Sequence, residues 1–366
     1  MRTFSHPGYK RFLLSVGCLL SIHFTALFFL TLFRLVFFFS ANYDFPDQEH
    51  VGFMSIWPAF IRGVWFDNVI ACYILLIPLV AVSISALFNY YGKILWNVTC
   101  IFFSLFYGIV LLVTAANIPY FQYFFKIINS SVFNWFGYMN TTAGMVFGET
   151  SYYPPLIGFL LTLVLFIWLM RRLIRHFQRL LNTKNPSVFW LDRIYIFLTA
   201  GICIGLCLFG IRGRTGYNPI KVSAAYYCTD PFLNQLGISP VFNLLSSTLD
   251  DSRKENRYLH LMPENEALEN TRHYLNRPGI EGISPIARQI NASDSLRRPN
   301  IVLIFMESMS AHLMKRFGQQ KELTPFLDSL YRQSLAFSNF YSSGIHTNHG
   351  MYATLYSFPS ILKRNA

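Results

Sequence analysis

The stretch Asn300-Ile-Val-Leu-Ile-Phe-Met-Glu-Ser308 has the pattern of a buried β-strand that ends on a carboxylate. Its continuous apolar run, Ile301 to Met306, is typical of a parallel strand covered on both faces. Glu307 then falls at the carboxyl end of the strand, where open α/β sheets bind their ligands. Downstream, Gly344-Ile-His-Thr-Asn-His-Gly350 predicts a turn that presents a hydroxyl group. A metal-assisted transfer reaction needs such a carboxylate and such a hydroxyl side by side.

The residues around these two motifs predict two helices and a second strand. Thr324 as N-cap and Pro325 as the first helical residue begin a helix that runs toward Phe337. A short strand is expected over 337–341 and a helix from about Met351. The alternation of apolar runs and helices indicates the beginning of an α/β domain.

Thr347 is the candidate nucleophile of this domain. It is expected near a helix N-terminus, where backbone N–H groups favour phosphate. A neighbouring divalent cation would activate its hydroxyl, and carboxylate and alkoxide oxygens suit manganese or magnesium. His346 and His349 flank it and are candidate substrate contacts, although loop histidines without a ligand are commoner. Spacing alone leaves open the simpler interpretation, in which Glu307 is a strand-end cap and Thr347 a helix N-cap.

The composition is that of an integral membrane protein. Of the 366 residues, 53% are hydrophobic and 13% are charged, against about 25% charged residues in ordinary soluble domains. Five apolar stretches approach or exceed the roughly 20 residues that a membrane-spanning helix needs. The first is too long for the apolar part of a signal peptide, so an uncleaved anchor is expected. The stretches cover about 12–33, 64–87, 94–116, 155–170 and 194–211.

The distribution of Lys and Arg predicts the orientation of these helices. The N-terminal tail, the loop at Lys93 and the loop over 171–193 together hold ten basic residues. The opposite loops hold only Arg62 and Lys126, with Arg34 at the end of the first helix. The N-terminus is therefore expected in the cytoplasm and the chain after about residue 212 outside the bacterial cytoplasmic (inner) membrane.

The net charge of +12 follows in part from this asymmetry. The basic residues form no clustered patch with interleaved aromatic side chains, so a nucleic-acid partner is not expected. Five of the six cysteines fall in predicted membrane helices, and Cys228 alone lies outside them. This arrangement predicts neither a disulfide framework nor a zinc site.

The chain divides into three parts in this interpretation. Residues 1–211 form a five-helix transmembrane domain, 212–298 an extracytoplasmic connector with a helix over 263–276, and 299–366 the start of the α/β domain. The loop over 117–154 is rich in aromatic residues, which fits either an interfacial belt or a cover over a lipid headgroup site. Arg34 and Asp67 lie near the outer ends of their helices, and their pairing is one interpretation of these charges.

The order of the motifs resembles the lipoteichoic acid synthase-like phosphoglycerol transferases, a branch of the sulfatase and alkaline phosphatase superfamily. The resemblance rests on the five-helix front end and its Gly210-Ile-Arg-Gly213 exit, and on four downstream motifs. These are Asn300-Ile-Val-Leu-Ile-x-x-Glu-Ser, Thr324-Pro-Phe-Leu, Phe340-Tyr341 and Gly344-x-x-Thr347. It implies a five-helix transmembrane N-terminal unit followed by the start of an α/β sulfatase-like extracytoplasmic domain.

The resemblance also implies an activity. Members of that family move phosphoglycerol from the phospholipid phosphatidylglycerol to a glycan or lipid acceptor through a phospho-threonine intermediate. Thr347 would then be the nucleophile and a metal ligand, and Glu307 a metal ligand, with Mn²⁺ or else Mg²⁺ as cofactor. The family's other metal ligands, an Asp-His pair and a further histidine, would follow Ala366, so we expect the 366-residue chain alone to be inactive.

Two other classes of function stay open at this stage. The chain would be a non-catalytic membrane remnant or scaffold if no further metal ligands follow it. A sulfate-ester hydrolase is the weaker alternative, because secreted sulfatases usually carry cysteine or serine where this chain has Thr347.

Overall fold

The computed structural model describes most of the chain in two compact units, Met1–Leu261 and Met262–Ala366. The described residues are 6–41, 53–181, 189–253, 262–276, 300–306, 309–344 and 347–357.

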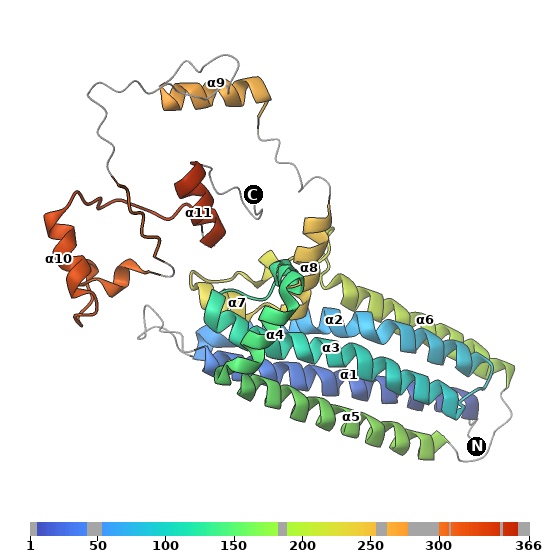
Figure 1. The fold of residues 1–366 in the computed structure, drawn as a ribbon. Helices are drawn as coiled ribbons and strands as arrows, with labels where there is room; N and C mark the ends of the chain where they lie inside the picture. The colour runs from blue at the N-terminus through green and yellow to red at the C-terminus, as the bar shows by residue number, and fades with distance from the viewer. Residues whose placement is uncertain are drawn as a thin grey trace. The chain divides into compact units, whose positions relative to one another are not determined.

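Five long apolar helices form the bundle of the first unit, and each is long enough to cross a membrane. They run side by side (Figure 1). All five predicted segments are confirmed, and the fourth differs most in length, because the basic residues after residue 170 are good helix formers that prolong it. The helices are α1 (Pro7–Ser40), α2 (Phe53–Leu87), α3 (Lys93–Phe124), α5 (Tyr153–Leu181) and α6 (Trp190–Arg212).

Helix α1 lies at the centre of the bundle, because it packs against α2, α3, α5 and α6. Phe12, Leu19 and Ile22 on this helix are fully buried. Helices α5 and α6 bury a much smaller share of their most apolar stretch than α1 and α2 do. Their exposed apolar side chains suit contact with lipid, since a helix satisfies its own backbone hydrogen bonds and needs only an apolar surface there.

The first part of the connector packs onto the bundle. Gly213 ends α6 at φ 73°, and a Cβ atom there would lie 2.7 Å from Ile220 Cγ2, so this turn requires glycine. Helices α7 (Pro231–Leu236) and α8 (Pro240–Ser252) follow. The Phe232 ring of α7 is buried, with its centroid 5.8 Å from that of Phe37 and 5.6 Å from that of Phe121. The connector therefore begins as part of the membrane unit.

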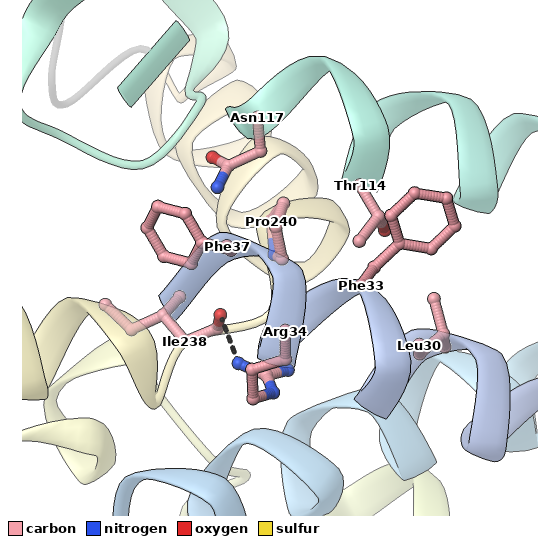
Figure 2. Close-up of a pocket in the computed structure, with 8 residues that line it drawn as sticks. All are labelled: Leu30, Phe33, Arg34, Phe37, Thr114, Asn117, Ile238 and Pro240. Atoms are coloured by element: carbon pink, nitrogen blue, oxygen red, sulfur yellow. Dashed lines mark hydrogen bonds between the residues drawn. The ribbon is translucent and has the colours of Figure 1, made fainter. Parts of the chain in front are cut away.

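A buried ion pair joins α1, α2 and this connector. Arg34 Nη2 donates to Asp67 Oδ2 at 2.6 Å, and both side chains are almost fully buried. Arg34 Nη1 also donates to the carbonyl oxygen of Leu236. The same nitrogen donates to the carbonyl oxygen of Ile238 at 3.1 Å (Figure 2). The guanidinium lies across Gly63, where a Cβ atom would come within 2.2 Å of it. The pairing of Arg34 with Asp67, which was one interpretation of the sequence, is confirmed. The connector supplies the two carbonyl oxygens as further partners of Arg34.

A small cavity lies beside Arg34 (Figure 2). Only about 10 Å³ of it admits the centre of a water molecule, which is the space that a single water needs. A phospholipid headgroup is far larger, so the cavity is not a substrate pocket. Its lining residues are Leu30, Phe33, Arg34, Phe37, Thr114, Asn117, Ile238 and Pro240.

The second unit contains short helices joined by turns. Helix α9 (Glu264–Leu275) confirms the helix predicted in the connector and ends at Asn276, which has φ 51°. Helix α10 (Pro325–Gln333) begins with Thr324 as N-cap and Pro325 in its first turn, as predicted. Helix α11 (Thr347–Tyr356) follows, and two short 3₁₀ helices, η5 (Ala311–Leu313) and η6 (Lys315–Phe317), precede α10.

The two predicted strands are not formed among the described residues. Residues 301–306 pair with no strand there, and their side chains are between 45% and 87% exposed. Residues 337–341 also lack strand pairing. An apolar strand of the predicted kind becomes buried only when neighbouring strands and covering helices surround it. The described part of the second unit supplies no neighbouring strand and leaves this stretch largely exposed, so the expectation of a buried strand is wrong for this structure.

The Asp328 carboxylate holds the turns before α10 in place. It accepts hydrogen bonds from the backbone N–H of Lys315 at 3.2 Å and of Arg316 at 3.3 Å. The Thr324 hydroxyl lies 3.1 Å from Asp328 Oδ2. Desolvation raises the pKa of Asp328, but these backbone and hydroxyl donors outweigh it and hold the pKa below its ordinary value.

We predict that breaking the Arg34–Asp67 pair destabilises the bundle strongly. Asp67→Ala and Arg34→Ala should each lower the free energy of unfolding by about 3–5 kcal/mol, because each leaves an uncompensated buried charge. The measurement is chemical unfolding in mixed micelles. The double variant completes a double-mutant cycle, which gives the coupling energy between the two side chains. Arg253→Ala is the control, since its ion pair with Asp250 is exposed and such pairs contribute about 0–1 kcal/mol. If the effects of the two single variants simply add in the double variant, Arg34 and Asp67 are not directly coupled.

We also predict an acid-sensitive turn at Asp328. The pKa of Asp328 is lower in the folded chain than in the unfolded chain. The Asp328 carboxylate therefore stabilises the folded turn fully above the unfolded-state pKa, about 3.9. This stabilisation is lost as the pH falls through the folded-state pKa. Hydrogen exchange, corrected for intrinsic rates, should show the Lys315 and Arg316 amides losing protection in acid and in Asp328→Ala. Ser329→Ala, one residue away, should keep the protection; equal loss in both variants would refute this role of the carboxylate.

Candidate functional site

Thr347 is the first residue of α11, and its side chain is exposed. The predicted position at a helix N-terminus is therefore confirmed. The first backbone N–H groups of a helix have no partners within it, and they form a favourable setting for an anionic group. An exposed hydroxyl at this place is able to meet a phosphate group from solution or from a membrane surface.

The loop before α11 folds back onto the first turn of that helix. Gly344 lies so close to His349 that a Cβ atom at position 344 would be 2.5 Å from His349 Cβ. The Ser342 hydroxyl donates to the Gly344 carbonyl oxygen at 2.5 Å. His349 is 8% exposed as a result. This burial favours a packing role for His349, and its contact with substrate stays a prediction.

The apolar stretch before Glu307 reaches the same helix. A Cβ atom on Gly350 would lie 3.2 Å from Cζ of the Phe305 ring, so this ring packs directly on the first turn of α11. Phe305 precedes Glu307 by two residues, and Gly350 follows Thr347 by three. The segment predicted to carry the carboxylate thus meets the helix that carries the hydroxyl, although neither belongs to a sheet within the described ranges.

Two residues of the predicted site, Glu307 and His346, lie outside the described residues. Their side chains therefore have no stated geometry. Within the ranges that the structure does describe, no group of three or more His, Cys, Asp or Glu side chains is arranged to hold a metal ion. The site as described consists of Thr347 on α11, the buried His349 and the Phe305–Gly350 contact.

Sequence reasoning missed the two glycine contacts of this site. The motif Gly344-x-x-Thr347 drew attention to the loop, but nothing in it indicated that Gly344 makes room for His349. The Phe305–Gly350 contact joins residues 45 positions apart (350 − 305). A pattern of apolar residues along the chain carries no signal for such a contact.

Residues 299–365 match the Sulfatase family model. This match supports the sulfatase/alkaline phosphatase superfamily for the C-terminal segment, which is the coarser part of the resemblance noted from the motifs. Together with the five apolar helices, it defines a membrane-helix unit followed by the start of a sulfatase-like domain. No curated protein and no solved structure matches the chain.

We predict that Gly344→Ala disturbs the start of α11. The new Cβ atom would lie 2.5 Å from His349 Cβ and 2.8 Å from its Nδ1 atom, so the loop or the helix must shift. Hydrogen exchange should show faster exchange of the amides over 347–352 in this variant. Gly205→Ala is the control, because open space surrounds Gly205 in α6. Unchanged protection in Gly344→Ala would show that the close packing is not required.

Proposed function

We propose that the protein is a membrane-anchored, metal-dependent transferase of the sulfatase superfamily. It moves phosphoglycerol, or a similar phospho-headgroup, from a phospholipid such as phosphatidylglycerol to a glycan or lipid acceptor. The observation that carries the proposal is the exposed hydroxyl of Thr347 at the start of α11, inside the segment that matches the Sulfatase family model. A helix N-terminus suits the phosphate of such a substrate.

Thr347 acts as the nucleophile in this proposal. Its Oγ1 atom forms a bond to phosphorus while the bond from phosphorus to the diacylglycerol oxygen breaks, and diacylglycerol leaves with a proton. An acceptor hydroxyl then attacks the same phosphorus atom and regenerates the threonine hydroxyl. The backbone N–H groups of the first turn of α11 orient the phosphate oxygens during both steps.

Glu307 and Thr347 are the proposed ligands of a divalent cation. Both donate oxygen, and oxygen donors suit Mn²⁺ or Mg²⁺. The Phe305–Gly350 contact supports this pairing, because it joins the segment next to Glu307 to the helix of Thr347. When bound, the cation activates the threonine oxygen and neutralises charge on the phosphate.

The membrane unit is the reason for proposing a phospholipid as the donor. Five apolar helices keep the C-terminal segment attached to a bilayer, which is where a phospholipid headgroup is found. The Lys and Arg distribution supports an orientation with the N-terminus in the cytoplasm and the transferase segment outside the bacterial cytoplasmic membrane. The acceptor is then a glycan or lipid at the outer surface.

We predict that the hydroxyl of Thr347 is indispensable. In full-length protein purified from its native membranes, including any residues that follow Ala366, and given labelled phosphatidylglycerol with Mn²⁺, mass spectrometry should find a phosphoglycerol adduct on Thr347; the 366-residue chain alone is expected to show none. Thr347→Ala should lose the adduct and reduce turnover by about 10³-fold or more, and chelation of the metal should have a similar effect. Thr347→Ser keeps a hydroxyl and should retain part of the activity. Thr271→Ala on the exposed face of α9 is the control.

The same experiment separates the rival functions. Full turnover by Thr347→Ala would remove Thr347 from the mechanism. Native protein without adduct and without turnover would favour a scaffold. Hydrolysis of an aryl sulfate in place of headgroup transfer would identify a sulfate-ester hydrolase.

A further inference from the structure

The segment between α3 and α5 contains a long stretch without a charged side chain. Residues 127–148 contain no Asp, Glu, Lys, Arg or His. The segment folds as η1 (Ser130–Tyr138), α4 (Met139–Gly148) and η2 (Thr150–Tyr152). It links the end of α3 to the start of α5, at the end of the bundle where α7 and α8 also lie (Figure 1).

One side of this segment is fastened to α8. The backbone N–H of Ser130 donates to Ser247 Oγ at 2.9 Å, and the Ser130 hydroxyl donates to Asp251. Asn243 Nδ2 donates to the carbonyl oxygen of Ile128 at 2.9 Å. These bonds hold η1 against the helix through which the connector continues.

A second set of contacts, between aromatic rings, holds the segment against the C-terminal end of α3. The Trp135 ring centroid lies 5.8 Å from that of Tyr120 and 5.7 Å from that of Phe124. Clusters of tryptophan and tyrosine are typical of the boundary between a membrane and water. Tyr123 on α3 and Tyr153 on α5 are also exposed, by 68% and 40%.

The exposed surface of the segment includes large apolar side chains. Phe136 is 61% exposed, Met139 57% and Phe147 67%. Helix α4 has ten residues, and a helix of that length is marginal in water without further contacts. It packs on the short helices η1 and η2. Lipid is the environment that would stabilise such a helix, since an apolar surface of this kind marks a contact site.

We propose that η1 and α4 lie in the outer leaflet of the bilayer, with Phe136, Met139 and Phe147 among the lipids. The occupant of this face is phospholipid, because the segment is continuous with spanning helices on both sides and offers no charge to a polar partner. Through Ser130 and Ile128 this contact also holds α8 at the membrane surface. The proposal does not depend on the catalytic role of Thr347.

Spin labelling of the full chain in phospholipid nanodiscs tests this. Single cysteines replace Phe136, Met139 and Phe147 in a background with the six native cysteines changed to serine or alanine. Labels at these sites should be more accessible to oxygen, which dissolves in lipid, than to a water-soluble nickel chelate. Leu161→Cys on α5 is the lipid control, and Tyr274→Cys on α9 is the water control, with side chains 67% and 87% exposed.

Each outcome decides the question. An oxygen-to-nickel accessibility ratio equal to that of Leu161→Cys, and several-fold above that of Tyr274→Cys, supports insertion. A ratio equal to that of Tyr274→Cys overturns it. Poor access by both reagents also overturns it, because another protein surface, such as a second copy, would then cover the face.

A measurement without substitutions guards against a background that fails to fold. Unmodified protein is illuminated in nanodiscs that contain a phospholipid with a diazirine in its upper acyl chain. Peptides that cover residues 130–149 should carry the lipid, as peptides of α5 do and those of α9 do not. Labelling of α5 without labelling of 130–149 would refute the proposal.

Discussion

The buried pair of Arg34 and Asp67 is the interaction on which the membrane unit depends. A charge placed within a bundle of apolar helices needs partners that compensate it, because desolvation is costly. Arg34 finds them in Asp67 and in the carbonyl oxygens of Leu236 and Ile238. Gly63 leaves room for the guanidinium. One side chain therefore aligns α1 with α2 and holds the end of α7 against both.

This arrangement makes the bundle and the first part of the connector a single body. Helix α8 starts where Arg34 holds the chain, and the hydrogen bonds of Ser130 join it to the apolar segment between α3 and α5. The second unit is different in kind. Local contacts such as those of the Asp328 carboxylate order its turns, while the apolar side chains over 301–306 remain exposed. Burial stabilises the first unit, whereas short-range hydrogen bonds dominate the described part of the second.

The candidate site shows how far sequence reasoning reached. The helix start at Thr347 and the Thr324-Pro325 cap were predicted correctly, because N-caps and first-turn prolines act over only a few residues. The buried strand over 301–306 was predicted wrongly for this structure, because burial depends on neighbours that a local pattern does not contain. Glu307 and His346 lie outside the described residues, so their roles remain predictions. The Sulfatase match supports the superfamily on which those roles rest.

The sequence by itself predicted five helices long and apolar enough to cross a membrane, and its motifs indicated the sulfatase superfamily that the family match supports for the C-terminal segment. Crossing a bilayer depends on the length of an apolar run, which is a property of the chain in one dimension. Only the tertiary structure decided which groups surround Arg34, why positions 63 and 344 are glycine, and that Phe305 packs on Gly350. Each of these is a contact between residues separated along the chain. Steric fit and hydrogen-bond geometry in the folded chain select such contacts, and the local sequence predicts neither of them.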